Sequence, residues 1–164
     1  MRGYVGVASA LATVSLLAAC GSSAGSGGEC TLVAGRTGVR LEIRPPFAAE
    51  VTGATLTVCH DGSCHRFAPR LDASTTTRSD GCTGEVCSGT AVRTGGRQGF
   101  ADVPGLPAGP VRVTVVLRGA SGARVLDRTV TVTPKGVFPN GRRCGESGRQ
   151  ASVVVADGRL SDGG

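Results

Sequence analysis

The sequence is poor in aromatic side chains. It has no tryptophan, one tyrosine and four phenylalanines. Proteins that bind single-stranded nucleic acid stack the bases on aromatic rings, and sugar-binding sites commonly place a Trp or Tyr against the sugar face. The composition therefore argues against nucleic acid as a partner and disfavours carbohydrate. It also disfavours a protein-binding hot spot built on Trp or Tyr, although arginine can take part in one.

Motifs for catalysis are missing as well. The Gly-x-Ser-x-Gly run at residues 21–25 belongs to a Gly/Ser-rich stretch with no strand or helix pattern beside it, and the chain contains no Cys-x-x-Cys pair. Such patterns present a nucleophilic serine only at a strand-to-helix turn, or a redox dithiol. His60 or His65 could act as a base for a serine, but no spacing identifies that serine, and paired carboxylates are absent as a local feature. We therefore predict that the protein is not an enzyme and needs no cofactor.

The apolar run from Tyr4 to Ala19 is too short to cross a membrane. It has about 16 residues, whereas a membrane-spanning helix needs about 20. Arg2 precedes the run and small residues end it. A basic start, a short apolar centre and small residues before a cleavage point describe a secretory signal peptide, which we predict over residues 1–19.

The apolar run ends in Leu17-Ala18-Ala19-Cys20. This sequence resembles the lipobox of bacterial lipoproteins, in which a peptidase cuts before the cysteine and the cysteine sulfur carries a diacylglycerol. The resemblance implies that Cys20 is lipidated and begins the mature chain, on the extracytoplasmic face of the cell membrane. Two or more acyl chains suffice for stable anchoring. The Gly/Ser-rich residues that follow predict a flexible tether, so residues 20–29 would link the anchor to the domain. An ordinary secretory signal with a chance cysteine is the alternative.

Alternating residues predict β-strands in the rest of the chain. Apolar and polar side chains alternate over 39–44, 54–58 and 111–118, the pattern of a strand buried on one face. No stretch past residue 20 keeps helical periodicity over three turns. The chain is therefore predicted to be all-β, with many short strands arranged as a sandwich or barrel.

Turn signals divide the remaining sequence. Ser121-Gly122 precedes a segment rich in Val and Thr, so residues 111–133 are predicted to form a hairpin. The folded domain is expected over 30–160, ending after a turn at Asp157-Gly158. Two more short strands are expected over 100–103 and 152–156. Residues 134–150 are expected to form a long loop, and residues 161–164 a disordered tail.

One stretch carries a more specific resemblance. Residues 103–115, VPGLPAGPVRVTV, resemble the Leu-Pro-Ala-Gly-x-Tyr-x-Val-x-Val run of bacterial immunoglobulin-like and fibronectin-like sandwiches. There the leucine and glycine shape a corner between the sheets, and the aromatic residue starts the next strand. The resemblance implies an immunoglobulin-like antiparallel β-sandwich with Leu106 and Gly109 at that corner. Val111 takes the aromatic position, so the hydroxyl hydrogen bond of a tyrosine corner cannot form.

Six cysteines remain if Cys20 is lipidated, and an even number in an exported domain is typical of disulfides. Fifteen pairings are allowed. A turn signal, Asp61-Gly62, lies inside one Cys-x4-Cys segment, and Gly84 lies inside a second with the same spacing, so each pair could face across a hairpin. The last two cysteines would then join the ends of the domain. The favoured pairs are Cys59–Cys64, Cys82–Cys87 and Cys30–Cys144.

A metal site is the alternative use of these residues. The two Cys-x4-Cys segments have some likeness to a four-cysteine zinc site, but such sites usually have two residues between paired ligands. An oxidising compartment also opposes free thiolates. Copper or zinc could instead be held by His60, His65 and Asp61 beside an intact disulfide, because the histidines flank a turn. The plainer expectation is that both are exposed loop histidines.

Three functions stay open on this evidence. The first is a binding or interaction module in the bacterial envelope, with the disulfide-stapled loops 59–66 and 78–93 as its surface. The second is copper or zinc capture at His60 and His65, and the third is a structural spacer without a ligand. A formal charge of +6 would suit anionic lipid headgroups or wall polymers, but the scattered arginines are typical of a solvated surface. The expected partners are the membrane, through the lipid anchor, and an unknown envelope protein or an anionic wall polymer.

Overall fold

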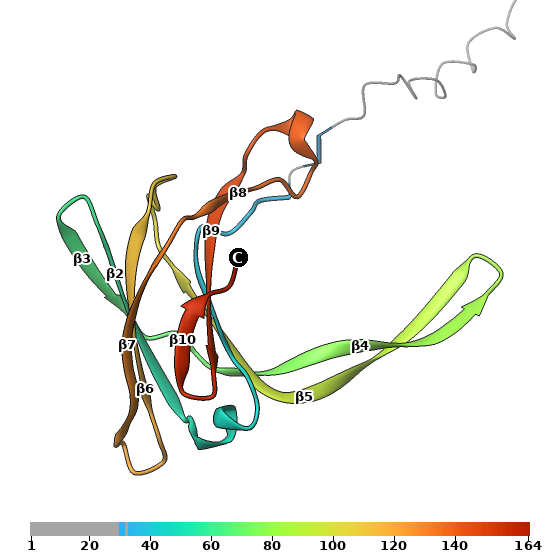
Figure 1. Cartoon of the computed structure of the whole chain (residues 1–164). Coiled ribbons are helices and arrows are strands. Elements are labelled where there is room, and N and C mark those ends of the chain that lie inside the picture. Colours follow the sequence, from blue (N-terminus) through green and yellow to red (C-terminus); the bar gives the residue numbers. More distant parts are fainter. Residues whose placement is uncertain (1–29, 32) are drawn as a thin grey trace, which may run out of the picture. The chain divides into compact units, whose positions relative to one another are not determined.

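The computed structural model describes residues 30–31 and 33–164 (Figure 1). The chain divides into two units, 1–31 and 32–164, and the fold described below is that of the second unit. The predicted signal peptide over 1–19, the lipidated Cys20 and the tether up to residue 29 lie outside the described residues. Within the part that the structure describes, no helix is long and apolar enough to span a bilayer.

Ten strands of this unit form two sheets. The six-stranded sheet has the order β10-β9-β1-β5-β4, with β8 also paired to β9, and the four-stranded sheet has the order β3-β2-β6-β7. The predicted all-β class is confirmed. The strand bounds are β1 (Gly38–Ile43), β2 (Gly53–His60), β3 (Ser63–Phe67), β4 (Asp72–Thr83), β5 (Val86–Asp102), β6 (Val111–Arg118), β7 (Arg124–Val132), β8 (Lys135–Val137), β9 (Gly148–Ala156) and β10 (Arg159–Asp162).

One strand pair departs from the expected antiparallel arrangement. β1 pairs antiparallel with β5 but parallel with β9, from Gly38↔Gln150 to Ile43↔Val155. Parallel neighbours cannot be joined by a tight turn, and here the chain passes through β2–β8 before β9 returns beside β1. The six-stranded sheet is therefore mixed, and the prediction of a purely antiparallel sandwich is wrong at this pair.

The core between the sheets is built mainly from valine and leucine. Leu41 of β1, Leu56 of β2 and Val115 of β6 are each 0% exposed. Phenylalanine does not enter the fully buried set among the described residues, and Phe47 and Phe67 pack against its margin. Full burial of such an aliphatic side chain contributes about 1.5–3 kcal/mol. The alternation that predicts the strands therefore also accounts for the core.

Residues 103–110 carry the chain from β5 in one sheet to β6 in the other. Leu106 is 4% exposed and belongs to the core, and Val111 is 1% exposed. Gly105 supplies the positive φ of the turn, +72°. Gly109 has no positive φ, and a Cβ at that position would meet nothing within 4 Å. The corner therefore depends on Leu106 and Gly105, and the role implied for Gly109 is wrong.

The C-terminal segment contains more regular structure than predicted. The expected loop over 134–150 includes β8, a 3-10 turn over Arg142–Cys144 and the start of β9. β10 pairs with β9, and the Gly163 N–H donates to the Ser152 carbonyl at 2.9 Å. The predicted disordered tail is therefore wrong for residues 161–163, because the outer edge of β9 offers backbone hydrogen bonds to the end of the chain.

Candidate interaction surface

The β2–β3 hairpin is closed by a disulfide next to its turn. Cys59 lies directly opposite Cys64, with Cα atoms 4.1 Å apart. Asp61 and Gly62 form the turn with φ values of +49° and +76°, the backbone of a two-residue type I′ turn. Val58 on the same strand is 0% exposed, so core packing holds this hairpin in addition to the bridge.

The two histidines lie on one face of this hairpin. His60 pairs with Ser63 and His65 with Val58, so the imidazoles are diagonal neighbours on one face, two rungs apart with the disulfide rung between them. His60 Nδ1 lies 3.2 Å from Asp61 Oδ2, and the Asp61 side chain is 84% exposed. Among the residues described here, no three His, Cys, Asp or Glu side chains gather to hold a metal ion. Of the predicted set, His60 and Asp61 lie within hydrogen-bond distance of each other, but the described residues do not form a three-ligand cluster that includes His65.

The cysteines of the described chain are all disulfide-bonded. Two bridges join Cys59 to Cys64 and Cys82 to Cys87, as expected from the hairpin spacing. Cys30 and Cys144 are each disulfide-bonded too, and their pairing with each other stays a prediction. The four-cysteine zinc alternative finds no free thiol in this part of the chain.

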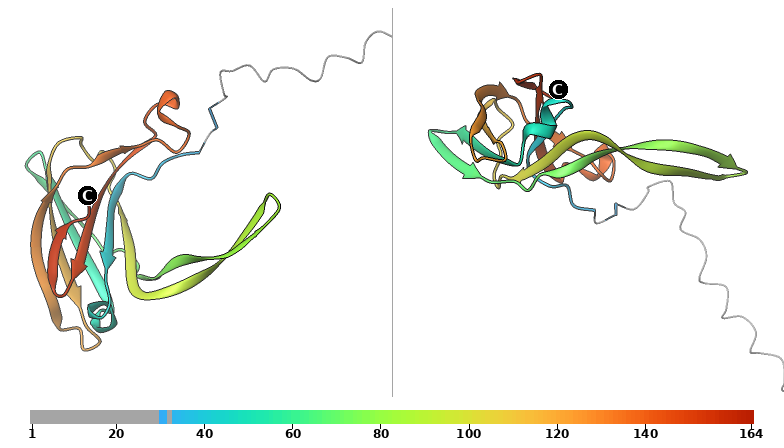
Figure 2. Two further views of the ribbon diagram at one scale, coloured as in Figure 1. Left: turned by 45° about the vertical axis from the view of Figure 1, so that its right-hand side comes forward. Right: turned by 90° about the horizontal axis from the view of Figure 1, so that it is seen from below.

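β4 and β5 continue beyond the sandwich as a two-stranded arm, which we define as residues 75–93 (Figure 1). Every residue from 75 to 91 is exposed. Figure 2 and Figure 1 agree that the arm leaves the sandwich on the side away from the β2–β3 turn. The expectation of a loop over 78–93 is therefore wrong, and so is its grouping with 59–66 as one surface.

The tip of the arm carries the second disulfide. Cys82 and Cys87 are directly opposed, with Cα atoms 4.0 Å apart, around a turn in which Gly84 has a φ of +62°. Val86 beside them is 74% exposed. A two-stranded hairpin without a covered face is marginally stable by itself. A bridge that closes so short a loop contributes roughly 2 kcal/mol, so it helps to keep the arm paired.

The direction of the arm is set by a bulge at its root. Between the rungs Ala73↔Arg97 and Thr75↔Arg93, β5 has three residues where β4 has one. Gly95 has a φ of +80°, and a Cβ on the buried Gly96 would lie 2.9 Å from the Ile43 carbonyl oxygen. Extra residues of this kind bend a strand and increase its twist. The two glycines therefore allow β5 to turn out of the sheet.

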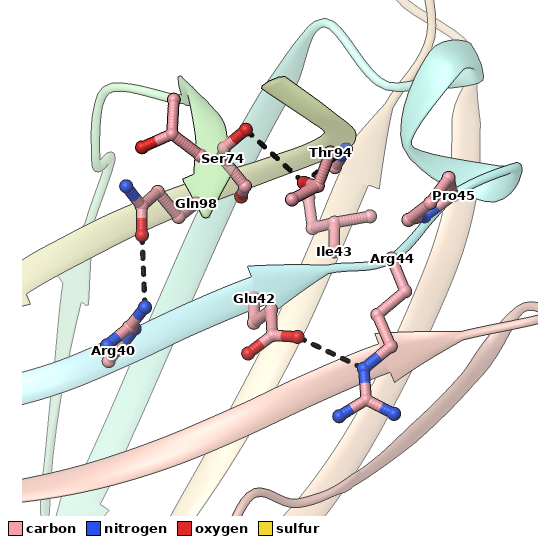
Figure 3. Close-up of a pocket in the computed structure, with 10 residues that line it drawn as sticks. Arg40, Glu42, Ile43, Arg44, Pro45, Ser74, Thr94 and Gln98 are labelled. Atoms are coloured by element: carbon pink, nitrogen blue, oxygen red, sulfur yellow. Dashed lines mark hydrogen bonds and ion pairs between the residues drawn. The ribbon is translucent and has the colours of Figure 1, made fainter. Parts of the chain in front are cut away.

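A shallow polar cavity of about 240 Å³ lies at this root, on the outer face of the six-stranded sheet (Figure 3). Arg40 donates to Gln98 Oε1 at 3.1 Å, and Arg44 donates to Glu42 Oε1 at 3.0 Å. The Ser74 hydroxyl is buried and has no hydrogen-bond partner among the described residues. Small-molecule pockets are usually larger, roughly 300–1,000 Å³, and mostly apolar. The cavity therefore does not resemble a ligand pocket, and its two arginines are already hydrogen-bonded to Gln98 and Glu42.

A second cluster lies further along the same outer face. The Arg36 guanidinium donates to both carboxylate oxygens of Asp102, at 3.1 and 2.8 Å, and stacks 4.0 Å above the Phe100 ring. The hydrogen bond from Arg36 holds the pKa of the Asp102 carboxyl below its ordinary value. Both side chains are more than half exposed, so the pair contributes little to stability.

Comparisons of the chain with protein families, curated proteins and solved structures found no match. Sequence reasoning missed the arm because residues 72–95 contain Thr, Ser and Gly without alternation. The available signals were the repeated Cys-x4-Cys spacing and the Thr-rich run before it, since threonine favours strands.

Proposed function

We propose that this protein is a lipid-anchored β-sandwich module of the bacterial envelope, and that its arm binds a partner there. The observation that carries the proposal is the unbroken exposure of residues 75–91 on a paired strand element. The lipobox-like sequence at Cys20 supports the anchor. Disulfides at both hairpins support an oxidising location outside the cytoplasm.

The strand order supports an immunoglobulin-like arrangement. In that fold one sheet has the order A-B-E-D and the other contains C, F and G, extended in variable-type domains by C′. β1, β5 and β4 correspond to B, E and D, and β3, β2, β6 and β7 to C′, C, F and G. β9 takes the place of strand A but runs parallel to its neighbour. Such sandwiches serve many functions, so the fold alone names none.

The energetics of the arm favour a role in binding. Fixing the backbone of one residue costs about 1–2 kcal/mol of conformational entropy, and the arm recovers little of this by burial because residues 75–91 are exposed. A paired hairpin also presents free backbone N–H and C=O groups along its edges, which are templates for another chain. An element that adds little to the core and offers free edges is suited to contact with a partner.

Site-specific photo-crosslinking in cells that export the full chain tests this proposal. A photoreactive residue at Ser88, on the arm, is expected to yield a discrete covalent adduct. The matched control is the same residue at Arg159 of β10, an exposed position on the sandwich, which should yield none. If the chain reaches the cell surface and Ser88 forms no adduct, the binding role is wrong and a spacer without a ligand is favoured.

A further inference from the structure

One edge of the arm is long, regular and unprotected. β1 pairs with β5 only over Arg97–Asp102, so within the described residues the side of β5 away from β4 is free over 86–93. This edge contains no proline and no lysine, the residues that commonly block edge-to-edge pairing. It is therefore open to the addition of another strand.

The opposite edge of the arm, along β4, is interrupted. Ser79 pairs with Gly89 and Gly81 with Ser88, so Asp80 is an extra residue that breaks the pairing. Gly81 has a φ of +103° at that point. Bulges of this kind protect strand edges, whereas the residues of β5 from 86 to 93 are paired consecutively. The regular edge for strand addition therefore belongs to β5.

The disulfide shows which backbone groups point to the free edge. In an antiparallel ladder the closer rungs, about 4.5 Å between Cα atoms, are those without mutual hydrogen bonds. Cys82 and Cys87 are 4.0 Å apart, so the N–H and C=O of Cys87 point outward. With the period of two along a strand, the backbone groups of Gly89, Ala91 and Arg93 point outward as well.

This edge is complementary to itself. Antiparallel pairing of two β5 edges about Gly89 places Val86 of one copy opposite Val92 of the other. It also brings Glu85, in the turn directly before β5, to the level of Arg93, and each contact occurs at two symmetric positions. Val86 is otherwise 74% exposed. In the described part of the chain, neither Glu85 nor Arg93 takes part in an ion pair. The pairing would give both charges a partner.

Other registers lose this complementarity. If one copy of β5 slides along the other by a single residue, residues whose backbone groups point to the free edge lie opposite residues whose groups point back to β4. The hydrogen bonds of the ladder then cannot form. If the two-fold axis instead passes through Ser88 or Thr90, the ladder can still form. Glu85 then lies opposite Ala91 or Gly95, respectively, and loses its charged partner. Pairing about Gly89 is therefore the register in which backbone, charge and apolar contacts agree.

We propose that the partner of the arm is a second copy of this chain, joined through antiparallel β5 edges about a two-fold axis at Gly89. The two arms then form one four-stranded sheet, in which the outer strands are the two copies of β4. The inference rests on the binding role proposed above and specifies its partner. Isologous two-fold contact is the commonest arrangement of protein dimers.

Two proline variants test which edge is used. Thr77 and Ala91 face each other on one rung, on β4 and β5 respectively, and the N–H of each points away from its partner strand. Proline at either site removes a donor from an outer edge without removing a bond of the hairpin. Sedimentation of the full chain, exported by a bacterial host and extracted in mild detergent, is expected to show a monomer–dimer equilibrium. Ala91→Pro should abolish the dimer, whereas Thr77→Pro should leave it intact.

A charge exchange tests the register without altering the backbone. Either Glu85→Arg or Arg93→Glu alone places like charges opposite each other at two symmetric positions. Each cross-strand pair contributes up to about 1 kcal/mol. The single variants should therefore raise the dimer Kd about 10-fold or more. The double variant, Glu85→Arg with Arg93→Glu, should restore the parent Kd to within about three-fold. Failure of the double variant to recover would overturn the register.

The two proposals fail in distinguishable ways. A parent chain that stays monomeric up to about 100 µM, or a dimer that survives Ala91→Pro, would overturn the second copy as partner. If Ser88 still forms an adduct with a different envelope protein in cells, the binding role of the arm stands. Absence of both the dimer and any Ser88 adduct would overturn both proposals.

Discussion

The β2–β3 hairpin and the arm are closed in the same way, by a disulfide across the rung beside the turn. In the first hairpin Leu56 and Val58 are both 0% exposed, because apolar residues alternate along β2. In the arm every residue from 75 to 91 is exposed, because Thr, Ser and Gly do not define an apolar face. The bridge therefore shapes the turn, and the residues further along the strands decide whether the hairpin joins the core.

Core truncation should give the largest contrast between the two hairpins. Leu56→Ala removes a fully buried side chain of β2 and is expected to lower the free energy of unfolding by about 2–5 kcal/mol. Val86→Ala at the tip of the arm should change it by less than about 0.5 kcal/mol, as is usual for exposed positions. Urea unfolding of both variants measures the difference. Equal losses would show that the arm is part of the core unit.

Removal of each bridge should also separate the hairpins. Cys59→Ser with Cys64→Ser is expected to lower the free energy of unfolding by roughly 2 kcal/mol, because that hairpin folds with the core. Cys82→Ser with Cys87→Ser should leave it nearly unchanged and instead speed amide hydrogen exchange within residues 81–88. A global loss from the second pair would contradict the independence of the arm.

Two glycine substitutions sharpen the account of the root. Gly95→Ala should cost about 1–2 kcal/mol, because the φ of +80° strains a side-chain-bearing residue. Gly109→Ala is the control, since a Cβ there meets nothing within 4 Å, and it should be tolerated to within about 0.5 kcal/mol. Thermal unfolding compares them, and a cost at Gly109 would restore the role that the sequence resemblance implied for it.

The smallest effect is expected at Asp102. Its pKa lies below the ordinary value because Arg36 donates to the carboxylate. A lowered folded-state pKa means that the contact is present above the ordinary aspartate pKa and is lost as the pH falls through the folded value. An NMR titration of Asp102 should therefore show a midpoint that rises in the Arg36→Gln variant. An unchanged midpoint would remove Arg36 as the cause.

Sequence alternation predicted the part of the fold that is buried on one face. β1, β2 and β6 lie where alternation predicts them, and β7 lies where the turn signal and the Val/Thr-rich segment predict the second strand of a hairpin. The parallel partner of β1 could not be predicted, because β9 comes from far along the chain and its own residues do not encode direction. The arm could not be predicted from periodicity because neither of its faces is buried. Its local signals were the spacing of Cys82 and Cys87, which also fits a loop, and the Thr-rich run before it.

The most direct test of the account is to shorten the arm in the full chain. Thr76 and Val92 form one rung, so residues 77–91 can be replaced by Asn-Gly, which favours a two-residue hairpin turn. The account predicts that the free energy of unfolding in urea stays within about 1 kcal/mol of the parent value, because the removed residues are exposed. A loss of several kcal/mol, or a chain that no longer folds, would contradict the claim that the arm stands outside the core and is free to bind.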